Sequence, residues 1–261
     1  MQPFFHTTPQ PDPENNFPDC LYIKMEGNPV QPESQDGFEF WKTSTQRYQI
    51  DLHLTIKFNE QWELLKQGRI KFGLKGGELR VKIENGEIPY DSRQLAGSIE
   101  LAMPEEKQET EASNDRKDLE VRALAINPSL NGSEPKPQTK VATEPRSSIT
   151  AQVPVTVCHI TTKLSEEHPT WVFEEEMGKP VLKGLLNKAK LATLNVHTLP
   201  CRVEATFEVS KRDVCLIDAE GLWPPDLSRN KRAVLDTLII QRLLEPKLKP
   251  YLSRANLRYD R

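Results

Sequence analysis

Few residues of this 261-residue chain could hold a metal ion. Zinc is bound in proteins by cysteine and histidine side chains at regular spacing. Cys158 and His159 are adjacent, whereas His197, Cys201 and Cys215 follow at irregular intervals. Cys201 also shares the strand parity of its apolar neighbours, which is typical of a buried core cysteine. We therefore expect no metal site and no cofactor.

Clustered carboxylates offer a second chemistry, because acidic residues on neighbouring strands can hold magnesium beside a lysine such as Lys211 or Lys231. Residues 174–176 are three consecutive glutamates, and four further acidic residues follow in the same half of the chain: Asp213, Asp218, Glu220 and Asp226. Adjacent residues of a strand point to opposite faces, so the three glutamates cannot converge. A metal-dependent enzyme remains the second alternative, and we assign no catalytic residue.

Other catalytic signatures are missing from the sequence. No Gly-x-Ser-x-Gly motif marks a nucleophilic serine. The glycine-rich segment at residues 73–77 lacks the lysine and hydroxyl pair of a phosphate-binding loop, so we interpret it as a hairpin turn between two strands. The sequence favours a protein that is not an enzyme.

The C-terminal segment carries the one group of residues that we assign to binding. Residues 228–261 hold nine basic and three acidic side chains, whereas residues 100–120 hold three basic and eight acidic ones. Cations interleaved with tyrosines can contact phosphates and stack on bases. The candidate partner-binding residues are Lys247, Lys249, Tyr251, Arg254, Arg258, Tyr259 and Arg261. Packing of the tyrosines on the body, with the cations in solvent, is the simpler interpretation.

The secondary structure that positions these candidate residues is clearest at residues 48–58, which we expect to form a strand. Apolar residues occupy every second position, which predicts a half-buried strand with Ile50, Leu52, Leu54 and Ile56 in the core. Further strands are expected at 69–74, 78–83, 98–101, 153–161, 170–175, 190–196, 202–209 and 214–218. The pattern predicts a mainly β fold with an antiparallel, β-sandwich-like body of one or two sheets or subdomains.

Turn residues predict the connections between these strands. Gly76-Gly77 suits a tight hairpin turn within an antiparallel meander, and Asn85-Gly86 supplies a second turn with positive φ. Residues 209–214 would form the bend of a hairpin. Residues 59–68 have the composition of a short helix, with Asn59 as its N-cap and Gly68 as its stop.

The C-terminal helix is expected to follow residue 226 and to end at Pro246. Its apolar residues form a wide stripe: Val234, Leu235, Leu238, Ile239, Ile240, Leu243 and Leu244. Such a stripe must be buried, and we expect it to pack on the protein's own sheet. A dimer or partner interface is the alternative.

The chain divides into five expected segments. They are a proline-rich N-terminal arm (1–37), a first β-rich block (38–103), an acidic and proline-rich insertion (104–150), a second β-rich block (151–226), and a basic C-terminal helix and tail (227–261). The arm is expected to hold no regular element, and 104–118 and 127–148 are expected to be disordered, because proline and charge replace apolar periodicity there. The stretch 119–126 could form a strand or a helical face.

Composition sets the functional class that we expect. The chain shows no apolar signal segment, no close cysteine pair and no window that could span a membrane, which favours a cytoplasmic protein with reduced thiols and no membrane insertion. The sequence predicts a non-enzymatic interaction or adaptor protein with a protein partner. A nucleic-acid-associated protein that uses the basic C-terminal segment is the first alternative.

Overall fold

The structure, a computed structural model, describes residues 6–7, 13–30, 48–103, 156–163, 168–223 and 227–260. The insertion at 104–150, with its expected disorder and its stretch at 119–126, lies outside these residues. The described strands of both β-rich blocks belong to one compact unit.

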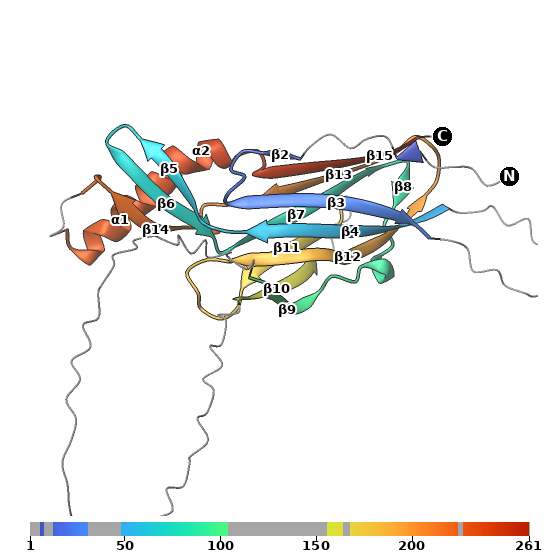
Figure 1. The fold of residues 1–261 in the computed structure, drawn as a ribbon, viewed down its shortest axis with the longest axis horizontal. Coiled ribbons are helices and arrows are strands. Elements are labelled where there is room, and N and C mark those ends of the chain that lie inside the picture. Colours follow the sequence, from blue (N-terminus) through green and yellow to red (C-terminus); the bar gives the residue numbers. More distant parts are fainter. Residues whose placement is uncertain are drawn as a thin grey trace, which may run out of the picture. The chain divides into compact units, whose positions relative to one another are not determined.

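The largest sheet, sheet A, takes strands from every described part of the chain (Figure 1). All of its strand pairs are antiparallel, and its order is β1-β15-β13-β7-β11-β10-β9, with β2 also paired to β15. The strands are β1 (His6–Thr7), β2 (Glu14–Asn15), β7 (Gly76–Glu84), β9 (Gly97–Leu101), β10 (Thr156–Lys163), β11 (Thr170–Glu175), β13 (Cys201–Glu208) and β15 (Ser253–Asp260).

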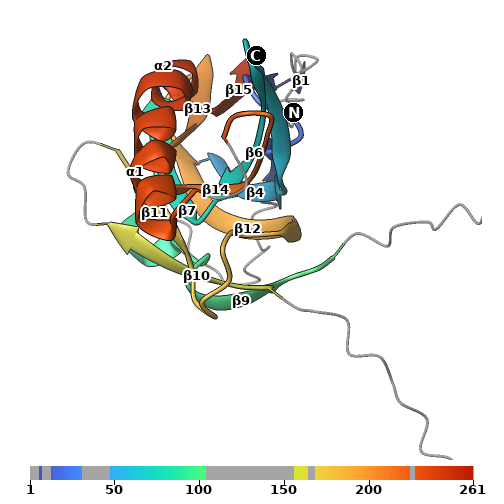
Figure 2. The same ribbon diagram turned by 90° about the vertical axis from the view of Figure 1, so that its left-hand side faces the viewer.

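Two smaller antiparallel sheets complete the described strands. Sheet B has the order β3-β4-β12-β8 and sheet C the order β14-β6-β5. Their strands are β3 (Leu21–Pro29), β4 (Tyr48–Phe58), β5 (Gln61–Leu65), β6 (Gly68–Leu74), β8 (Gly86–Glu87), β12 (Gly184–Val196) and β14 (Val214–Glu220). A short 3-10 turn, η1 (Tyr90–Ser92), precedes β9. Figure 2 shows β13, β7 and β11 on one side of the interior, with β4 and β12 on the other.

Three phenylalanines join sheets A and B in the core. Phe58 of β4 lies 6.0 Å from Phe173 of β11 and 5.8 Å from Phe207 of β13, measured between ring centroids. Phe173 and Phe207 are 5.7 Å apart, so each ring contacts the other two. One of these residues comes from the first β-rich block and two come from the second.

The mainly β, antiparallel, sandwich-like fold with one helical segment near the C-terminus is confirmed. The expected strand at 48–58 is β4, and its four predicted core residues are fully buried. The strand expected at 170–175 is β11, and the other expected strands are present with shifted ends. The largest shift is in β12, which begins six residues earlier than expected, at Gly184, and contains two register shifts.

The short helix predicted at 59–68 is wrong. Residues 61–65 form β5 instead, which pairs with β6 from Gln61 opposite Phe72 to Leu65 opposite Gly68. The amide of Asn59, the expected N-cap, donates to the carbonyl of Cys20 over 2.9 Å. Glutamate, leucine, lysine and glutamine favour a helix locally, but strand pairing and tertiary contacts override that preference.

The predicted meander is also wrong, because its strands enter different sheets. β6 belongs to sheet C and β7 to sheet A, so Gly76-Gly77 makes no hairpin turn. A Cβ atom on Gly76 would lie 2.3 Å from the carbonyl oxygen of Phe173, and one on Gly77 would lie 2.3 Å from the ring of Phe207. The two glycines therefore allow β7 to lie close to its neighbours. Asn85 has the expected positive φ, 64°, where the chain passes from sheet A to sheet B.

The hairpin predicted at 209–214 is wrong for the same reason, since β13 lies in sheet A and β14 in sheet C. The chain does turn there, and the Ser210 amide donates to Oδ2 of Asp213 over 2.8 Å. Part of the expected N-terminal arm is also ordered. Residues 21–29 form β3, which pairs with β4 along its whole length because no proline interrupts the alternation of Leu21, Ile23 and Met25.

The C-terminal helical segment differs most from expectation. It consists of α1 (Arg229–Ile239), a π-helical turn η2 (Ile240–Leu244) and α2 (Glu245–Leu248), so Pro246 does not end it. Pro246 lies near the start of α2, after the π-helical turn. The residues that follow are not a surface tail but form β15, an inner strand of sheet A.

A close approach between β3 and β15 generates the first testable prediction. A Cβ atom on Gly27 would lie 1.7 Å from the hydroxyl oxygen of Tyr259, which is buried and has no hydrogen-bond partner among the described residues. We expect Gly27→Ala to destabilise the protein by about 1–3 kcal/mol through overpacking. Tyr259→Phe should be close to neutral or stabilising, because it removes an unsatisfied polar group.

In the double variant, the Gly27→Ala penalty should shrink, since the clashing oxygen is gone. Chemical denaturation of the four proteins measures this coupling. Strict additivity of the two changes would contradict the packing of β3 on β15.

Candidate interaction surface

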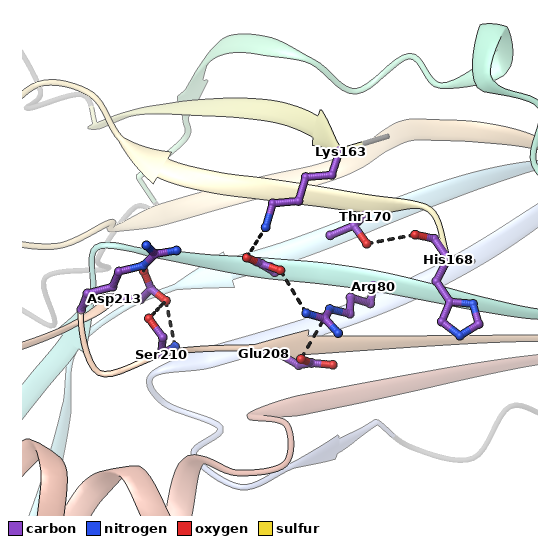
Figure 3. A network of polar contacts seen from close by, with 9 residues as sticks. Arg80, Lys163, His168, Thr170, Glu208, Ser210 and Asp213 are labelled. Carbon is purple, nitrogen blue, oxygen red and sulfur yellow. Dashed lines mark hydrogen bonds and ion pairs between the residues drawn. The ribbon is translucent and has the colours of Figure 1, made fainter. Parts of the chain in front are cut away.

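A chain of ion pairs crosses the outer face of sheet A (Figure 3). Lys163 on β10 binds Oε1 of Glu78 on β7. Glu78 Oε2 lies 3.3 Å from Nη2 of Arg80, and Arg80 Nε lies 3.5 Å from Oε2 of Glu208 on β13. Partial burial opposes the ionisation of Glu78, but hydrogen bonds from Lys163 and Arg80 outweigh it and lower the pKa of that carboxyl. The network links three strands and holds an ionised glutamate, which suits structure rather than proton transfer.

The cysteine and histidine candidates do not come together. Cys158 and Cys201 are buried in the core, while His159 lies on the opposite face of β10 with its Nδ1 3.2 Å from the Ser98 hydroxyl. His197 Nε2 is 3.6 Å from a carboxylate oxygen of Glu87. Within the described ranges, no group of three histidine, cysteine, aspartate or glutamate side chains could hold a metal ion.

The buried thiols are poor nucleophiles. Burial raises the pKa of Cys20 and of Cys158 to about 12 and that of Cys201 to about 11, so these thiols stay protonated at neutral pH.

The acidic candidates are dispersed over two sheets. Glu174 is exposed on β11 of sheet A, whereas Asp218 and Glu220 lie on β14 of sheet C. Glu220 forms an ion pair of 2.7 Å with Arg69. Asp213 accepts hydrogen bonds from Ser210 within its own turn, as Figure 3 shows, and Asp226 lies outside the described residues.

The predicted partner-binding segment is largely neutralised by the protein's own carboxylates. Its cations pair as follows: Lys247 with Glu63, Lys249 with Glu245 at 2.6 Å, Arg254 with Glu204 at 2.8 Å, and Arg258 with Asp260 at 2.9 Å. Tyr251 donates its hydroxyl proton to Glu14 over 2.8 Å. Arg261 lies outside the described residues.

Tyr259 requires a correction, because it is fully buried and cannot stack on a base. Strand parity explains the placement: Ala255, Leu257 and Tyr259 share the inner side of β15, and the cations occupy the outer side.

The apolar stripe of the C-terminal helical segment is only partly buried, which corrects the expectation that all of it packs on the protein's own sheet. Leu244 is fully buried, and Leu235, Ile239 and Ile240 are half-buried. Val234 is 60% exposed and Leu238 38% exposed, and no residue of α1 is buried. In Figure 1, the helical segment lies beside the strands of sheet C, with α1 at the far left of the view.

A shallow apolar hollow of about 410 Å³ lies beside the exposed side of α1. It is lined by Leu227, Asn230, Lys231, Val234 and Leu235. Sequence reasoning placed Val234 and Leu235 in the stripe but missed the exposure of Val234. The available signal was the width of the stripe, because seven apolar residues cover more of the helix than one contact with a sheet can bury.

Comparison of the chain with protein-family models, curated proteins and solved structures gives no match. In the part of the chain that the structure covers, no helix has the length and apolar character needed to cross a membrane. The assignment of function therefore depends on the surface itself.

The network on sheet A predicts a pH-dependent contribution to stability. Because the pKa of Glu78 is lowered in the folded protein, its contribution is present above the ordinary glutamate pKa of 4.5 and is lost as the pH falls through the lowered value. We expect Glu78→Gln to lower the free energy of unfolding by about 1 kcal/mol at pH 7, and by progressively less as the pH falls below 4.5.

Glu84→Gln on the same face of β7 is the matched control. Glu84 is 53% exposed and its distance to Arg202 is 3.8 Å, so a smaller effect is expected. Equal losses for the two variants at pH 7, or a Glu78→Gln loss that does not shrink as the pH falls below 4.5, would contradict the electrostatic role of Glu78.

Proposed function

We propose that the protein is a non-enzymatic interaction protein whose β-sandwich-like body presents α1 as a binding element for another protein. The observation that carries this proposal is the exposure of Val234 and Leu238 on α1, which continues into η2 and α2, where Leu244 and Leu248 are buried.

The arrangement of the apolar side chains supports binding. Single exposed apolar residues are ordinary on protein surfaces. Val234 and Leu238, however, lie one helical turn apart, and Val234 lines the apolar hollow together with Leu227 and Leu235. Apolar residues at this spacing are the anchors that helices use when they contact a partner.

The nucleic-acid alternative has less support. Lys247, Lys249, Arg254 and Arg258 each have a carboxylate partner within the protein, and a phosphate would have to compete with that partner. A cytoplasmic location remains part of the proposal and is supported by four cysteines that are all free.

Site-specific photo-crosslinking tests the proposal. A photoreactive amino acid at position 234 in the full chain should give a discrete adduct with a second protein in native extract, and Leu238→Glu should abolish it. The same group at Ala233, which is exposed about 100° around the helix, is the control and should give no such adduct. Equal labelling from both positions, or an adduct that survives Leu238→Glu, would refute α1 as the binding element.

A further inference from the structure

The exposed side of the C-terminal helical segment carries a cation before and after the apolar pair of α1, Lys231 in α1 and Arg242 in η2. Lys231, Val234, Leu238 and Arg242 follow one another at spacings of three, four and four residues, which places them along one side of the helical segment. All four side chains are exposed. A ligand that contacts Val234 and Leu238 would therefore lie between the positive charges of Lys231 and Arg242.

These two cations differ from those that follow in the chain. Lys231 and Arg242 form no ion pair with any described residue, whereas Lys247 and Lys249 each pair with a glutamate. The only acidic residue of α1, Asp236, lies on another side of the helix, partly buried and close to Arg232. The potential along the apolar strip is therefore positive.

A second copy of the chain does not suit this surface. Two such strips would bring like charges together.

An anionic lipid surface also fits less well. Helices that lie in membrane interfaces carry leucine, tryptophan and phenylalanine on the apolar face, and the aromatic side chains anchor them at the level of the lipid headgroups. α1 has no aromatic residue, and its apolar surface borders a hollow that can accept a side chain.

We infer that the partner contributes an acidic amphipathic helix, with an apolar side chain in the hollow beside Val234 and carboxylates on Lys231 and Arg242. This inference rests on the proposed function. Complementary charge sets the orientation of the helix and accelerates encounter, and the apolar contact supplies affinity.

Selection from a random peptide library tests the chemistry of the partner without knowledge of its identity. The full chain is the bait, and the displayed peptides are about 16 residues long, roughly four helical turns. We expect enriched peptides with leucine-like residues three or four positions apart and an excess of aspartate and glutamate. The most enriched peptide should bind at least tenfold more weakly to the double variant Lys231→Glu/Arg242→Glu, and binding should weaken with salt.

The matched control is Lys57→Glu/Lys66→Glu, which reverses two exposed lysines elsewhere and gives the same net charge. It should change the affinity less than twofold. Equal weakening by both double variants would show a non-specific charge effect and would overturn the inference. Basic, uncharged or absent enriched peptides would overturn it as well.

A separate binding experiment uses vesicles that contain phosphatidylserine. Binding of these vesicles that depends on Lys231 and Arg242, without selection of acidic peptides, would assign the surface to lipid and overturn the inference. If position 234 still gives its Leu238-dependent adduct while the selected peptides are not acidic, the proposed function stands and only the acidic partner is wrong. If position 234 gives no Leu238-dependent adduct and the selected peptides are not acidic, both the proposed function and the acidic partner are refuted.

Discussion

The inner position of β15 in sheet A constrains the whole C-terminal half of the fold. β15 is hydrogen-bonded to β13 on one side and to β1 and β2 on the other, and it buries Leu257 and Tyr259. The preceding strand, β14, lies in sheet C, so residues 229–248 must connect the two sheets. Leu244 and Leu248 anchor this helical connection. α1 lies on the other side of that anchor, and its outer side stays uncovered.

The same topology explains why the two β-rich halves of the sequence share a core. β7 from the first half lies between β13 and β11 from the second, and β4 pairs with β12. Phe58, Phe173 and Phe207 then meet between the sheets. Most strand partners are therefore distant in sequence, whereas β5 and β6 are consecutive and form a hairpin.

Local patterns predicted the elements better than their connections. Alternation at 48–58 identified which side of β4 is buried, since burial of one face fixes side-chain parity. The helix expected at 59–68 failed because residues 61–65 pair as a strand with the next strand, β6, and the hairpin expected at Gly76-Gly77 failed because the partners of β7 come from distant segments. The apolar stripe of the C-terminal helix correctly predicted an amphipathic helix. Whether Val234 is buried, however, depends on whether a sheet extends far enough to cover that side of the helix. No single-sequence pattern contains that information.

The exposure of the outer side of α1 is the central claim, and the free energy of unfolding tests it most directly. Val234→Asp should change this free energy by less than about 0.5 kcal/mol, because its side chain is 60% exposed, and Leu238→Asp, at a position 38% exposed, by less than about 1 kcal/mol. Leu244→Asp should lower it by about 3 kcal/mol or more, because it buries an unpaired charge. Circular dichroism should show an unchanged helix signal for the first two variants. If Val234→Asp destabilises the protein as much as Leu244→Asp does, the outer side of α1 is packed within the protein and is not available to a partner.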